Sequence, residues 1–189
     1  MERKINICRP GFGASCALCC GSHNYLSGRE DMEVMFSQRK SMVGHFCSEG
    51  LEVLSNRESL HILQQQLMDN SLPCHIEDAI RCPFVGFVDH DEKQLGCLIY
   101  GEGGSDPRVL HMSTICGTFS CLSREILSDE EILFAARLTG DWYYYSLLIN
   151  NITMLRELIS RYPSPEHVPD AVRAQAQAAL KEKLFTPTD

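Results

Sequence analysis

Apolar residues recur at helical spacing in the first half of the chain, and this pattern predicts two helices. The first helix covers residues 29–43. The second follows a capping box formed by Ser55 and Glu58 and ends near Asn70 and Pro73. The apolar positions of these two helices are Met32, Met35, Phe36, Val43, Leu60, Leu63 and Leu67.

The second half of the chain shows the same periodicity. A capping box of Ser128 and Glu131 opens one helix, which Gly140 interrupts. An apolar stripe over residues 142–162 then predicts one long helix ended by a proline, and residues 170–184 predict a last helix. We interpret the stripe as core positions rather than an aromatic binding surface; it consists of Trp142, Tyr145, Leu148, Ile152, Leu155, Ile159 and Tyr162.

Residues 83–100 have a different pattern, because two short apolar runs flank a polar turn at residues 89–93. This pattern predicts a β-hairpin. Cys82 precedes the first strand and Cys97 lies in the second, so antiparallel pairing can bring these two cysteines near each other.

The predicted fold class is α+β and mostly helical. Irregular cysteine-rich loops and the short β-hairpin pack on a helical body. We expect a metal-binding domain over residues 1–125, with a helical insert at about residues 26–73. Residues 126–189 form C-terminal helices that pack on this domain.

Charge and composition exclude several classes of protein. The chain has 189 residues and a formal net charge of −8, with no run rich in lysine or arginine, so nucleic-acid binding is not expected. The N-terminus is charged but has no apolar stretch behind it, which argues against a signal peptide. No segment approaches the roughly 20 apolar residues that cross a bilayer. We therefore expect a cytoplasmic protein that does not bind a membrane.

Ten cysteines is a high number for such a chain. Disulfides are rare in a reducing compartment, so clustered cysteines there more often bind metal or carry out redox chemistry. Cys47 and Cys74 stand apart from the clusters, and we interpret them as buried or structural residues. The remaining eight are predicted metal ligands: Cys8, Cys16, Cys19, Cys20, Cys82, Cys97, Cys116 and Cys121.

The sequence Cys16-Ala17-Leu18-Cys19 has the spacing at which two thiolates can converge on one ion across a tight turn. The same spacing suits an iron–sulfur cluster. Vicinal cysteines such as Cys19 and Cys20 do not easily chelate one zinc ion together. Eight thiols suffice for two four-thiolate sites or for one compact two-metal site, and this number favours zinc slightly over a single iron–sulfur cluster.

These cysteines resemble the YkgJ-type cysteine-cluster family. The similarity lies in a run ending at Cys19-Cys20, then Cys82-Pro83-Phe84, then Cys97-Leu98-Ile99-Tyr100, then Cys116 and Cys121. It covers about residues 8–121, interrupted by the insert. The resemblance implies a zinc- or iron-chelating domain, of a kind also found in a flagellin lysine N-methylase. Tyr100 is followed by a glycine-rich loop and Cys116 by Gly117, which departs from the family pattern and leaves the role of Cys116 open.

The sequence thus predicts a metal-binding protein that holds zinc ions or an iron–sulfur cluster. An iron–sulfur protein for electron transfer, or part of a methylase-like protein-modifying enzyme, is one alternative. A metal-free module that binds a protein partner is another. No catalytic motif is found. Imidazole can replace a thiolate as a metal ligand, but we interpret His23, His75 and His111 as surface or hydrogen-bonded residues.

Overall fold

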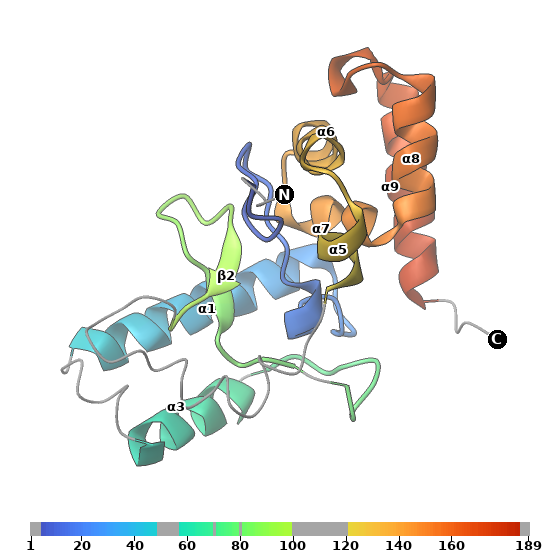
Figure 1. The fold of residues 1–189 in the computed structure, drawn as a ribbon. Coiled ribbons are helices and arrows are strands. Elements are labelled where there is room, and N and C mark those ends of the chain that lie inside the picture. Colours follow the sequence, from blue (N-terminus) through green and yellow to red (C-terminus); the bar gives the residue numbers. More distant parts are fainter. Residues whose placement is uncertain (1–4, 49–56, 70, 80, 100–120, 186–189) are drawn as a thin grey trace. The chain divides into compact units, whose positions relative to one another are not determined.

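The computed structural model describes residues 5–48, 57–69, 71–79, 81–99 and 121–185. Within these residues the chain forms seven α-helices and one antiparallel hairpin, which confirms the predicted mostly helical α+β fold class (Figure 1). No helix in these ranges is long and apolar enough to span a membrane. The elements are η1 (Leu18–Cys20), α1 (Arg29–Ser48), α3 (Arg57–Asp69), β1 (Val85–Phe87), β2 (Leu95–Cys97), α5 (Leu122–Ile126), α6 (Asp129–Thr139), α7 (Trp142–Asn150), α8 (Ile152–Arg161), η3 (Pro165–His167) and α9 (Asp170–Phe185).

The chain divides into two compact units. Unit 1 consists of Met1–Leu18 together with Cys121–Asp189, and unit 2 consists of Cys19–Ser120. By their contacts, the first 18 residues therefore group with the C-terminal helices, and the expected division of the chain after residue 125 stays a prediction. The expected boundary after residue 125 falls inside α5.

Unit 2 is built on α1, whose apolar face packs against the hairpin (Figure 1). The ring of Phe36 meets that of Phe87 edge-on, with ring centroids 6.3 Å apart. In the hairpin Val85 pairs with Cys97 and Phe87 with Leu95. The apolar residues predicted for α3 are fully or almost fully buried, so both predicted helices and the hairpin are confirmed, while the Ser55 cap lies outside the described residues.

Unit 1 contains α5 to α9 and the N-terminal loop. Ser128 caps α6 in a complete capping box with Glu131, as predicted, and Gly140 ends that helix in a left-handed conformation. The last helix, α9, confirms the prediction over residues 170–184. Trp142 and Tyr145 are 1% and 0% exposed, which confirms that they are core residues.

One helix prediction is wrong. The apolar stripe over residues 142–162 belongs to two helices, α7 and α8, rather than to one long helix. The chain leaves helical geometry at Asn151, where φ is −107° and ψ is 71°. The Asn151 side chain then accepts a hydrogen bond from the Met154 N–H and caps α8. Asparagine competes with the backbone for such hydrogen bonds, which is why it favours helix ends over helix interiors.

Candidate metal centre

The loop that carries Cys8 and Cys16 folds back on itself. The Cys16 N–H donates to the Cys8 carbonyl at 3.0 Å, and the Ala14 N–H donates to the Gly11 carbonyl at 3.0 Å. Gly13 at the tip has a φ of +76°, and a Cβ placed there would lie 2.8 Å from the Gly140 carbonyl oxygen. The loop therefore lies directly on the turn between α6 and α7, and its hydrogen bonds bring residues 8 and 16 side by side.

Two side chains of α7 hold this loop. The Tyr145 hydroxyl donates to the Ile7 carbonyl at 2.8 Å. The Ser146 hydroxyl donates to the Trp142 carbonyl of its own helix at 2.7 Å and also lies 3.3 Å from the Ser15 carbonyl. Ile7 and Ser15 each immediately precede a cysteine. Both side chains are fully buried, so the loop is fixed next to its two thiols rather than at its exposed tip.

Cys121 is the first residue of the second chain segment of unit 1, and this segment contacts the same helix. It is the N-cap residue of α5, and the Ser123 hydroxyl of that helix donates to the Asn150 side chain of α7 at 3.2 Å. Tyr145 and Asn150 are five residues apart on α7, a rise of about 7.5 Å. Helix α7 therefore supports the segments that carry all three cysteines of unit 1.

Electrostatics agrees with this arrangement. Burial raises the pKa of Tyr145 well above its usual value, and the negative charges of Cys16, Cys8 and Cys121 raise it further. Thiols at three distant positions in the sequence therefore act on one buried hydroxyl. Because Tyr145 stays protonated, it continues to donate its hydrogen bond to the Ile7 carbonyl.

Unit 2 holds a second set of thiols, beginning with Cys19 and Cys20 at the end of η1. A hydrogen bond with the Cys20 side chain lowers the pKa of Cys19 to about 6, although burial opposes the shift. Backbone hydrogen bonds at both residues lower the pKa further. A thiol with a pKa of about 6 is mostly thiolate at neutral pH, and the thiolate is the form that binds metal.

Cys82 and Cys97 lie on the hairpin close to Cys20. The Cys82 N–H donates to the Cys20 carbonyl at 2.9 Å. Cys82 belongs to the buried apolar cluster between α1 and α3, and both Cys20 and Cys97 pack against that cluster. Strand pairing places Cys97 opposite Val85, three residues after Cys82, and the direct approach of the two thiols stays a prediction.

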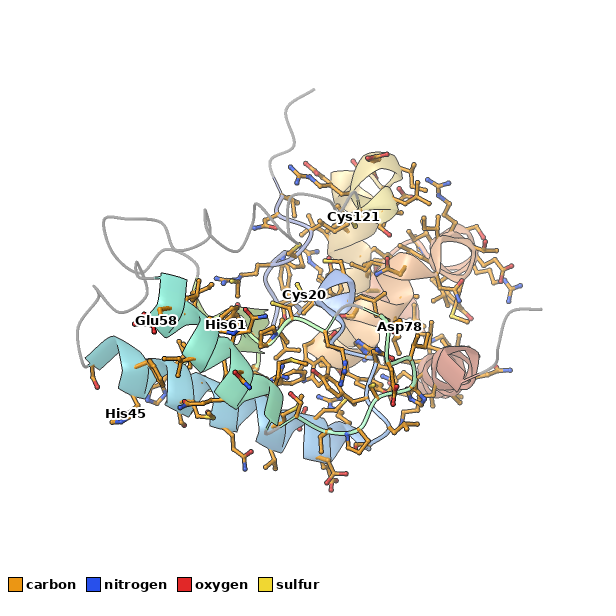
Figure 2. The ribbon with its side chains drawn as sticks, turned by 90° about the horizontal axis from the view of Figure 1, so that it is seen from below. Cys20, His45, Glu58, His61, Asp78 and Cys121 are labelled. Atoms are coloured by element: carbon orange, nitrogen blue, oxygen red, sulfur yellow. The ribbon has the colours of Figure 1, made fainter. Side chains whose placement is uncertain are left out.

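The cysteine thiols of neither unit form a compact group. No group of three or more histidine, cysteine, aspartate or glutamate side chains with metal-binding geometry is found in the ranges that the structure describes. Binding of an ion by either set therefore requires side-chain movement. Figure 2 labels Cys20 of unit 2 and Cys121 of unit 1, each within its own unit.

The remaining candidates lie outside these sets or outside the described residues. Cys116 and His111 fall in the undescribed range, as does the side chain of Cys47. Cys74 pairs with Tyr25 through the backbone in an isolated antiparallel β-bridge and is half-buried. His23 is buried, and its Nδ1 lies 2.9 Å from the Ser22 hydroxyl, which agrees with a hydrogen-bonded role.

An open groove of about 970 Å³ runs along α1 beside the hairpin turn, and no predicted metal ligand is among its described lining residues. Several of its charged residues form ion pairs. Arg29 contacts Glu33 at 2.8 Å, and Lys40 contacts Glu92 at 3.5 Å. His45 of α1 is exposed and points away from α3 (Figure 2).

Comparison with protein-family models, with curated proteins and with solved structures found no match for this chain. The chemistry of the site therefore rests on the residues themselves.

The sequence analysis missed two residues that support the cysteines. Tyr145 was interpreted only as a core residue, because its contact with Ile7 spans 138 positions and leaves no local pattern. Arg39 is 2% exposed, and its guanidinium donates to the Cys82 carbonyl at 3.3 Å and to the Tyr25 hydroxyl at 3.0 Å. Arg39 lies three residues after Phe36 and four before Val43, so its position on the buried face was visible in the helical spacing.

Proposed function

We propose that this protein binds a thiophilic metal, as zinc ions or an iron–sulfur cluster, through its clustered cysteines. The observation that supports the proposal most is that cysteine-bearing segments from distant parts of the chain are held to the same elements. Segments around residues 8, 16 and 121 meet on α7, and segments around residues 20, 82 and 97 meet on the hairpin of unit 2. Soft thiolates are the ligands preferred by zinc and iron–sulfur clusters.

The acidity of Cys19 also supports metal binding. A thiol must lose its proton to bind a metal, and Cys19 has a pKa of about 6 before any ion is added. The resemblance of the cysteine pattern to the YkgJ-type cluster family points to the same chemistry.

The proposal is tested on protein purified without oxygen, by elemental analysis and by an absorption spectrum. Stoichiometric zinc with no visible absorption identifies zinc sites. Iron and sulfide together with a brown colour identify an iron–sulfur cluster and favour the electron-transfer or protein-modifying alternative. Absence of any stoichiometric metal rejects the proposal and favours the metal-free interaction module.

A pair of cysteine variants in unit 2 shows whether the thiols are responsible. Cys97→Ser removes a thiol of the predicted set, and we expect it to lower the metal content. Cys74→Ser is the matched control because Cys74 is a half-buried cysteine of the same unit outside the set. If both variants retain all the metal of the parent protein, Cys97 is not a ligand. Alkylation of the unmutated protein with and without a chelator gives the same information without any risk of misfolding.

A further inference from the structure

We infer that α9 is a releasable strap on unit 1. It covers an apolar groove formed by α6, α7 and α8, and it leaves this groove by local unfolding. The uncovered groove then binds an amphipathic helix of a partner protein in place of α9. The inference concerns unit 1 alone and does not depend on metal binding.

Helix α9 is docked by few side chains. Its side chains are described over residues 170–181, and among these only Leu180 is buried, at 4% exposure. In α7, against which α9 packs, seven of nine residues are buried. Elements with few buried apolar contacts lie at the low-stability end of a fold and open before the rest of it. We therefore expect α9 to separate from unit 1 while α7 stays folded.

The packing beneath α9 is incomplete. A cavity of about 10 Å³ remains between α9 and the helices below it, and the short side chain of Ala176 is part of its wall. Atoms that line a cavity lose dispersion contacts on that side. The buried Nε of Arg173, which also lines the cavity, has no hydrogen-bond partner among the described residues, and an unpaired buried donor is unfavourable. Both features weaken the docking of α9.

The surface that α9 covers is strongly apolar. Its lining side chains come from three helices and the segment before α9: Leu138, Tyr144, Leu148, Leu158 and Val168. The four aliphatic members of this group are at most 7% exposed while α9 is in place. Exposure of such a surface to water is unfavourable, so release of α9 favours a new apolar occupant. A groove that already holds one helix presents the geometry for binding another.

The side chains of α9 define the partner that fits the groove. Val172, Ala176 and Leu180 recur every four residues along α9, and the last two line the cavity. Lys181 follows directly, with its Nζ 5.6 Å from the centroid of the Tyr144 ring. The partner helix therefore has apolar residues at positions i, i+4 and i+8, followed by lysine or arginine. A middle residue larger than alanine fills the cavity and lets the partner compete with α9.

Hydrogen exchange of the unmutated full chain tests the release of α9. We expect the amides of α9 to exchange together, and at least about 100-fold faster than those of α7. Exchange of α9 at the rate of α7 overturns the inference, because α9 would then open only with the whole of unit 1. Exchange that advances residue by residue along α9 also overturns it, since the helix would then fray rather than detach.

A fluorescent peptide of residues 169–185 is the probe for the groove. The substitution Leu180→Ala in the full chain removes the one described side chain that α9 buries, and it should raise the released population by at least about 30-fold. Apparent affinity scales with the fraction of protein in the binding-competent state, so this variant should bind the peptide about 30-fold more tightly than the parent. Gln175→Ala is the matched control, because Gln175 is exposed on the same helix, and it should bind as the parent does.

Trp142 reports in the same samples whether unit 1 stays folded, because it is 1% exposed and begins α7. Tighter peptide binding by Leu180→Ala with native tryptophan emission supports the strap. Absence of this gain overturns it. Loss of native emission in Leu180→Ala overturns it as well, because α9 is then part of the core of unit 1. A peptide that itself carries Leu180→Asp should not bind, and equal binding of the two peptides contradicts recognition by the groove.

Discussion

The substitution Gly13→Ala tests how the cysteine loop of unit 1 is held. Gly13 has a φ of +76°, and a Cβ there would lie 2.8 Å from the Gly140 carbonyl oxygen. A left-handed conformation costs an alanine about 1–2 kcal/mol. The clash is with backbone, and Gly140 is itself fixed as the C-cap of α6, with its N–H 2.9 Å from the Ala136 carbonyl. Relief therefore requires the loop to move away from the helix.

Such overpacking costs about 1–3 kcal/mol. Together with the conformational cost, Gly13→Ala should lower the free energy of unfolding of unit 1 by about 2–5 kcal/mol. Gly11→Ala is the matched control. Its φ is +97°, but nothing lies within 4 Å of the added Cβ, so it has the conformational cost without the clash. The difference between the two variants isolates the contact with Gly140.

Urea unfolding followed by tryptophan fluorescence measures this difference. Trp142 is the single tryptophan of the chain, is 1% exposed and begins α7, so its emission reports on unit 1. We expect Gly13→Ala to unfold at lower urea than Gly11→Ala and to hold less metal at Cys8 and Cys16. Equal stability of the two variants would refute the contact between loop and helix turn.

Two further predictions concern other parts of the fold. Arg39→Met removes charged hydrogen bonds, including those to Tyr25 and the Cys82 carbonyl, and should lower the free energy of unfolding by about 2–4 kcal/mol. Hydrogen exchange of the α1 amides measures this loss, and exchange slower than a loss of this size implies contradicts the prediction. An equal loss of stability in the half-exposed control Arg29→Ala also contradicts it. Burial raises the pKa of Glu131, but the hydrogen bonds from Arg156 and Ser128 and the charge of Arg156 together outweigh it, so the net pKa is lowered. Glu131 therefore adds stability above its unfolded pKa of about 4.3, and this stability is lost as the pH falls through the lower folded pKa. In a plot of the free energy of unfolding against pH, Glu131→Gln should therefore reduce the slope between about pH 5 and pH 3.

Most of the helix prediction rests on patterns between residues that are close in the sequence. The apolar spacing of α3 and the capping box of α6 depend on residues within one or two turns of each other, and such signals remain visible in the sequence. The break between α7 and α8 was missed because the apolar stripe continues across it. A single side chain, that of Asn151, ends one helix and caps the next, and periodicity does not register such an exchange of hydrogen bonds.

The candidate site was less accessible to sequence reasoning, because its supporting contacts are long-range. The cysteines could be named from their clustering, but the contacts that hold their segments could not. Such contacts run from Ser146 to Ser15 and from Cys82 to Cys20. These contacts span 131 and 62 positions, a range over which no periodic pattern operates.

Chain entropy favours neither group of cysteine-bearing segments strongly. Cys16 and Cys121 are 105 positions apart (121 minus 16), and Cys20 and Cys82 are 62 apart (82 minus 20). Loop-closure entropy grows only as the logarithm of length, so these two loops differ by about 0.5 kcal/mol. A single buried hydrogen bond, such as that from Tyr145 to Ile7, contributes about 0.5–1.5 kcal/mol and so equals or exceeds that difference. The contacts that hold each cysteine-bearing segment therefore matter at least as much as the length of chain between the cysteines.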